Sequence, residues 1–248
     1  MRQDTRGPLW LLPIVYYLLF ALILVGYWFI YAVNPTVHAT WLRGEDHLIE
    51  WLTFMSFFMA FVFMAFVLQF HRKMNKWGLA YFSGITLFCF VCAGEEISWA
   101  QRVIGFGTPE VMLEANEQQE FNLHNMNFEH IRPQTLVAIC LDSIGIVLPL
   151  IGCRSTFRPG GRWRRYVAPL YLVPCFLFAD SLLWIQSQLK PWLIGTFGRD
   201  VAIMIRSDTR ELTEMFWGFC IMFTAFALYA AWERYNPPAD GNTELRVP

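Results

Sequence analysis

The chain is poor in charged residues. Asp, Glu, Lys and Arg make up only 16% of its 248 residues, whereas a typical soluble domain has about 25%. Hydrophobic residues make up 56% and are gathered in long blocks. The net charge of −1 provides no basic field of the kind that attracts nucleic acid. The composition therefore predicts a membrane protein and argues against a nucleic-acid-binding domain.

Several motifs that define common protein classes are also missing. The chain has no G-x-G-x-x-G, no Walker A sequence and no zinc-finger spacing. All six cysteines lie in or at the ends of apolar blocks, and none is in a loop where a secreted disulfide framework would place it. We interpret these cysteines as small buried apolar residues.

The apolar blocks predict a bundle of transmembrane helices. A helix needs about 20 apolar residues to cross a bilayer, and six segments meet this length. The first exceeds the roughly 7–15 residues of a signal-peptide core and is followed by no small-residue cleavage site, so we expect a retained span. We place the spans at 9–33, 51–70, 77–96, 134–153, 166–187 and 212–232, in one domain of residues 1–236 with a flexible tail at 237–248.

Charged residues in the loops predict the orientation. With the N-terminus inside, the inner segments contain twelve of the nineteen basic residues, and the outer segments contain fourteen of the twenty acidic ones. Basic residues are enriched in cytoplasmic loops. We therefore expect a multi-pass protein of the plasma (inner) membrane with both termini in the cytoplasm. The segment 192–205 is too short to span and contains Arg199 and Asp200, so we expect an interfacial or re-entrant segment there.

The segment 94–125 is the most unusual part of the chain. It contains six acidic residues, one histidine and several amides, and it begins where the third span ends. Carboxylates at a membrane edge are costly and usually functional. Thr108, Pro109 and Glu110 form a typical helix start, so we expect a short amphipathic helix from 109 to about 120, within an outer cap of residues 101–133. The predicted fold is all-α, with about six transmembrane helices beneath this cap.

The polar residues of several spans converge on the outer leaflet under this topology. If the third helix continues outward, Glu95, Ser98 and Arg102 lie on one face of it. An acid/base site predicts catalytic roles for Glu95, Glu96, Glu120 and His124. A divalent-metal site predicts Glu96, His124, Glu211 and Glu214 as ligands, although the Glu-x-x-His motif of helical di-metal proteins is absent. The predicted substrate-binding residues are Arg102, which would contact an anionic headgroup, and Asn116, Asn122, Asn125, Asp142 and Asp180.

The Glu95-Glu96 pair invites comparison with the intramembrane glutamate proteases related to CAAX prenyl proteases. That family contains Glu-Glu-x-x-x-Arg followed by Phe-x-x-x-His. Here five residues separate Glu96 from Arg102, and only two separate Phe121 from His124. Both spacings differ and no second histidine motif follows, so we do not assign the chain to that family.

Three functional hypotheses follow. The first is an enzyme-like carboxylate and histidine site at the outer leaflet, acting on a lipid or lipid-linked substrate. The second is a transporter of protons, ions or small molecules, in which Asp142 and Asp180 lie on the path. The third is a structural or assembly subunit of a membrane complex, in which the polar residues order the bundle.

Overall fold

The computed structural model describes residues 11–43, 47–113, 120–123, 133–152 and 166–235. Within these ranges every regular element is a helix, and there is no strand. Six helical segments are long and apolar enough to cross a membrane, which agrees with the predicted number and approximate positions of the spans. They are α1 (Leu11–Val33), α3 (Leu48–Leu68), α4 (Lys76–Glu96), α7 (Pro133–Asp142) with η3 (Ser143–Val147) and α8 (Leu148–Gly152), η6 (Leu170–Leu172) with α9 (Val173–Phe197), and α10 (Arg199–Tyr235).

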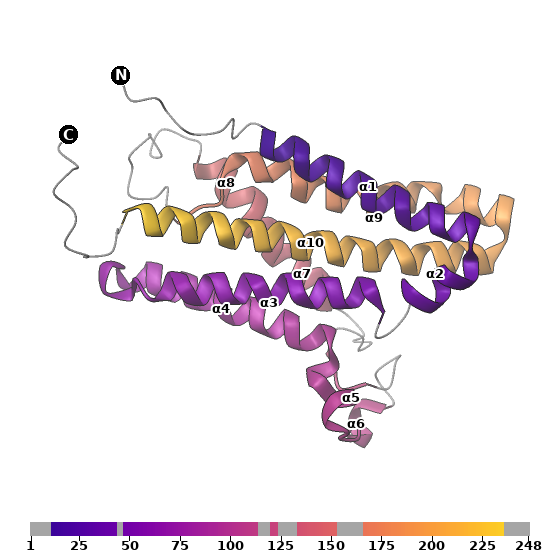
Figure 1. Ribbon diagram of the computed structural model, residues 1–248, viewed down its shortest axis with the longest axis horizontal. Coiled ribbons are helices and arrows are strands. Elements are labelled where there is room, and N and C mark those ends of the chain that lie inside the picture. Colours follow the sequence, from indigo (N-terminus) through magenta and orange to yellow (C-terminus); the bar gives the residue numbers. More distant parts are fainter. Residues whose placement is uncertain (1–10, 44–46, 114–119, 124–132, 153–165, 236–248) are drawn as a thin grey trace.

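Helix α10 is the central element of the bundle. It packs along α3 on one side and α9 on the other, while α4 packs against α3 and α1 lies against α9 (Figure 1). Its buried side chains include Leu212, Met215, Phe216, Cys220 and Ile221, all at 0% exposure. These side chains form part of the hydrophobic core of the bundle.

The two ends of the bundle differ. Successive spans run in opposite directions, so α1 begins and α10 finishes at the same end (Figure 1). The opposite end has the short helices α2 (Pro35–Trp41), η2 (Ser98–Ala100), α5 (Gln101–Ile104) and α6 (Glu110–Leu113). We call this the capped end and the other the uncapped end. The expected cap helix is described over Glu110–Leu113, and residues 114–119 lie outside the described ranges.

The expected interfacial segment at 192–205 is wrong. Helix α9 continues through Pro191 to Phe197, and α10 begins at Arg199, with only Gly198 between them at φ 87°. Glycine adopts this left-handed conformation without the steric penalty of other residues. Arg199 and the first-turn acid Asp200 therefore mark a helix start, where an acidic residue is favourable, and not a separate element.

The fourth span contains one turn of π-helix, Ser143–Val147. There Gly145 lies so close to Phe176 of α9 that an added Cβ would be 2.4 Å from the ring. Wide turns of this kind are frequent at functional sites. This one directly follows Asp142, and η3 itself packs against α9.

Candidate functional site

Helix α4 does not continue outward as predicted. It ends at Glu96, and Ser98, Trp99 and Ala100 follow with φ values of 46°, 55° and 59°. Three consecutive non-glycine residues in the left-handed region are rare and strained. The expected helical face shared by Glu95, Ser98 and Arg102 is therefore not formed, because α4 ends at Glu96 and a left-handed turn follows.

The left-handed turn places Trp99 back against α4. The Trp99 indole packs on Gly94, where an added Cβ would be 2.8 Å from the ring, and its Nε1 donates a hydrogen bond of 2.8 Å to Glu95 Oε1. Gly94 is thus required by a close approach and not by its own backbone conformation. These contacts offset part of the strain in the turn, since strained backbone persists only where its surroundings determine it.

Residues 120–123 form hydrogen bonds with this turn and with the end of α4. The Ser98 hydroxyl donates to the Glu120 carboxylate, and the Asn122 amide donates to Ser98 Oγ at 3.0 Å and to Glu120 at 3.2 Å. All three residues are buried. The backbone N–H of Leu123 donates to Glu95. Glu120 and Asn122, predicted to serve catalysis and substrate binding, thus contact the turn that positions Glu95.

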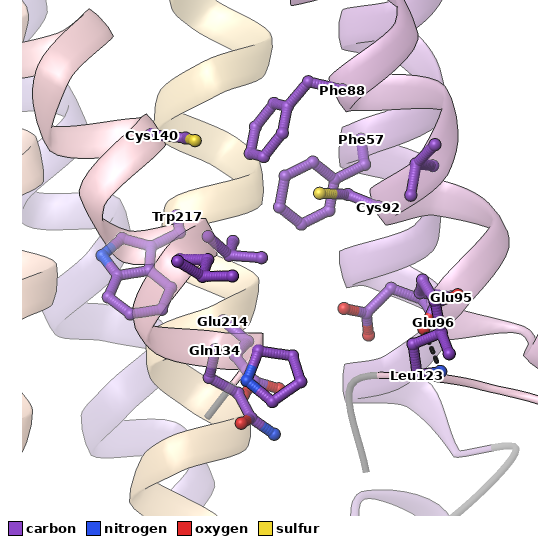
Figure 2. A pocket seen from close by; sticks show the side chains of 14 residues that line it. Phe57, Phe88, Cys92, Glu95, Glu96, Leu123, Gln134, Cys140, Glu214 and Trp217 are labelled. Carbon is purple, nitrogen blue, oxygen red and sulfur yellow. Dashed lines mark hydrogen bonds between the residues drawn. The ribbon is translucent and has the colours of Figure 1, made fainter. Parts of the chain in front are cut away.

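A pocket of about 290 Å³ lies between α4 and α7 at the capped end. Phe57, Phe88 and Cys92 are among the apolar residues along its length, while Glu95, Glu96, Glu214 and Gln134 gather at one end of it (Figure 2). The helices α4 and α7 have little direct contact with each other. Leu136 and Cys140, which line the pocket from α7, are also exposed on the bundle surface. The pocket is therefore a lateral cleft with apolar walls and a carboxylate end.

Glu95 and Glu96 have different surroundings although both line the pocket. Glu95 is 7% exposed and accepts hydrogen bonds from Trp99 and the Leu123 backbone (Figure 2). Glu96 is half-buried. A carboxylate held by two donors is fixed in position, since each such bond is charge-assisted.

Asp142 and Asp180 lie together deeper in the bundle. Their side chains come within hydrogen-bonding reach of each other, and the Trp217 indole donates a bond of 2.8 Å to Asp180 Oδ1. Because α9 extends to Phe197, Asp180 is about 25 Å from its capped end at 1.5 Å per residue, much deeper than the predicted span end at 187 implied. Trp217 also lines the pocket and so connects it to this pair.

The predicted metal ligands that lie in the described ranges do not come together in one cluster. Glu96 and Glu214 both line the pocket, but Glu211 does not. Within the part of the chain that the structure describes, no group of three His, Cys, Asp or Glu side chains is close enough to hold a metal ion. The predicted site residues that lie outside the described ranges are Asn116, His124 and Asn125, and the Arg102 side chain is likewise not described.

A second polar cluster at the capped end was missed by the sequence reasoning. Asp208 of α10 is fully buried and pairs with Arg43 Nε at 2.9 Å. His38 of α2 is 1% exposed, and its ring lies 4.4 Å from the Tyr27 ring and 5.2 Å from the Tyr31 ring. The only sequence signal was the position of Asp208 three residues before Glu211, which extends the acidic stripe of α10 by one turn. The cluster joins α1, α2 and α10.

Comparison of the chain with protein-family models, with curated proteins and with solved structures gives no match. The functional argument therefore depends on the pocket and its surroundings.

Proposed function

We propose that the protein is an integral membrane protein whose lateral pocket binds a lipid or lipid-linked substrate. The bias of basic residues supports an orientation with the capped end at the outer leaflet of the plasma (inner) membrane and both termini in the cytoplasm. The observation that carries the proposal is the cleft between α4 and α7, which combines apolar walls with carboxylates at one end. Ligand sites are typically apolar cavities with a few convergent polar groups.

The carboxylate end suits acid/base chemistry on the polar part of such a substrate. Glu96 is the favoured acid or base, with His124 as its proposed partner, because Glu96 lines the pocket and is less buried than Glu95. The reaction class is proton transfer during cleavage or transfer of a headgroup. Substitution of Glu96 by Gln keeps the shape and removes the titratable group, so it would abolish turnover while preserving binding of the apolar chain.

A photoreactive lipid tests the binding step. We expect a phospholipid with a diazirine in its acyl chain, incorporated into nanodiscs with the full chain, to label peptides of α4 and α7 saturably. Val137→Trp places a large ring in the pocket and should reduce this labelling to background. The matched control is Leu150→Trp, because Leu150 is 52% exposed on α8 and does not line the pocket.

The labelling pattern has a clear negative outcome. Equal labelling of α4 and α7 in the parent protein, Val137→Trp and Leu150→Trp would mean that the lipid touches only the outer surface of the bundle. The proposal would then be wrong. Thermal unfolding of both variants shows whether the inserted indole has disturbed the fold.

A second candidate function, proton transport, is favoured by the contact between Asp142 and Asp180. Paired carboxyl groups inside a membrane mark proton relays in pumps and transporters. This hypothesis predicts that Asp142→Asn in proteoliposomes abolishes a proton flux that the parent protein catalyses. The absence of flux in the parent would exclude it and leave the aspartate pair as a structural contact.

A further inference from the structure

Helix α5 exposes large apolar side chains although it lies outside the six spans. Val103 is 81% exposed, the highest value for a large apolar side chain in the described part of the chain, and Ile104 is 71% exposed. Gln101 of the same helix is held within the cap, because its Nε2 donates to Thr108 Oγ1 and its Oε1 accepts from the Phe121 N–H, each at 2.7 Å. Helix α5 is thus fixed to the cap by a polar residue while two aliphatic side chains are exposed.

Helix α5 lies beside the bundle and not above its end. Helices α9 and α10 continue well past the end of α4, whereas α5 and α6 project to the side of the bundle where α4 ends (Figure 1). The span of α4 ends at Glu96, so α5 lies at about the level of this boundary. In a membrane, the space beside a bundle at this level is occupied by lipid, and short elements in the plane of the interface bury an apolar side among its acyl chains.

A strip of exposed apolar side chains leads from α4 towards this surface. Leu87 and Phe90 are 62% and 44% exposed, and together with Gly94 they lie on one face of α4. The Trp99 ring packs on Gly94 and meets the Phe90 ring at 5.8 Å between centroids. Helix α5 begins two residues after Trp99. None of these four residues lines the lateral pocket, so the strip is a separate surface, continuous with the exposed side of a span.

We propose that α5 is an interfacial anchor, which inserts Val103 and Ile104 into the acyl chains of the leaflet beside α4. Transfer of aliphatic side chains from water to an apolar environment is favourable. Trp99 would lie at the boundary, where tryptophan is enriched because its ring is apolar and its N–H needs an acceptor, here Glu95. The sequence predicted an interfacial helix from residue 109, whereas this proposal assigns the membrane contact to α5. It does not depend on a ligand in the lateral pocket.

A photoreactive side chain shows what covers α5. Benzoylphenylalanine is incorporated in place of Ile104 in the full-length protein, which is irradiated in phosphatidylcholine nanodiscs, and the adducts are identified by mass. We expect lipid adducts as the main product. The matched control has the same residue in place of Glu110, an exposed carboxylate of the cap, and should give little lipid adduct. Equal lipid adducts at both positions would overturn the proposal. Adducts at Ile104 mainly with a second copy, or with another segment of the same chain, would also overturn it.

Hydrogen exchange in the same nanodiscs measures the strength of the contact. The Gly105 N–H donates to the Gln101 carbonyl at 2.7 Å, so exchange of this amide reports the opening of α5. We expect Ile104→Ala to accelerate this exchange about tenfold, because part of the transfer free energy of the removed groups is lost. If Ile104 faces water instead, the higher helix propensity of alanine leaves the exchange unchanged or slower, and the proposal fails. Glu110→Gln should exchange at the rate of the parent protein.

Discussion

The two ends of the bundle are stabilised in different ways. At the uncapped end, Phe82, Tyr166 and Trp232 pack with ring centroids 5.5–6.0 Å apart, and Phe82 and Trp232 are fully buried. At the capped end, buried carboxylates such as Glu95, Glu120 and Asp208 are held by hydrogen bonds or an ion pair. Apolar packing needs only volume and shape, whereas buried carboxylates need donors in exact places. The stability of the capped end therefore depends on the exact placement of hydrogen-bond donors, whereas that of the uncapped end depends on apolar packing.

Removing the largest ring of the uncapped end should have the largest effect on stability. We expect Trp232→Ala to lower the free energy of unfolding by about 3–5 kcal/mol, since it leaves a cavity in a fully buried site. Ligand binding by the folded fraction should not change, because Trp232 does not line the pocket. Chemical unfolding in detergent checks this value. Trp77→Ala is the control, as Trp77 is 74% exposed, and equal losses in both would refute the apolar account of this end.

Breaking the Arg43–Asp208 ion pair at the capped end should have a smaller effect on the free energy of unfolding. Asp208→Asn removes the charge that pairs with Arg43, and we expect a loss of about 2 kcal/mol, below the full value for a buried pair because the Arg43 side chain is 40% exposed. Asp200→Asn, at an exposed carboxylate of the same helix, should change stability little. If urea unfolding shows the same stability for both variants, the pair does not join α10 to the α2 region.

The turn after α4 can be tested with two glycines of the same helix. Gly94→Ala places a methyl group in close contact with the Trp99 ring, and the resulting overpacking costs about 1–3 kcal/mol. This cost exceeds the gain of about 1 kcal/mol that alanine provides in helix propensity. We expect a net loss of about 1 kcal/mol. Gly84→Ala has open space around it and should instead be neutral or slightly stabilising. Opposite signs of the two changes in thermal unfolding would support the packing of Trp99 on α4, and equal signs would argue against it.

The pH dependence of the capped end should be the weakest effect. Burial lowers the pKa of His38, and Arg43 acts in the same direction while Asp208 opposes it. The folded state therefore binds a proton less readily than the unfolded state, so the contribution of His38 is complete above pH about 6.5 and decreases as the pH falls below it. His38→Gln should flatten this slope, whereas His71→Gln, at an exposed position, should not. A parent slope that is unchanged in His38→Gln would show that the ring is not buried as a neutral group.

The sequence predicted the six spans because length and apolar content determine them. It could not predict the left-handed turn after Glu96, since no local pattern indicates three consecutive left-handed residues at Ser98, Trp99 and Ala100. The ends of α9 and α10 were missed because Arg199 and Asp200 appeared to mark a membrane boundary, although they follow a glycine that separates two long helices. Glu95, Glu96 and Glu214, which the sequence predicted to converge at one leaflet, line the same pocket. The cluster around Asp208 was missed because its partners Tyr27, His38 and Arg43 are distant in sequence.

An experimental structure of the full-length protein in phospholipid nanodiscs tests the central claim most directly. The account predicts elongated lipid density between α4 and α7 that follows Phe88 and Val137 and reaches the carboxylate end of the pocket. It would be contradicted if α4 and α7 closed against each other with their own side chains filling the cleft.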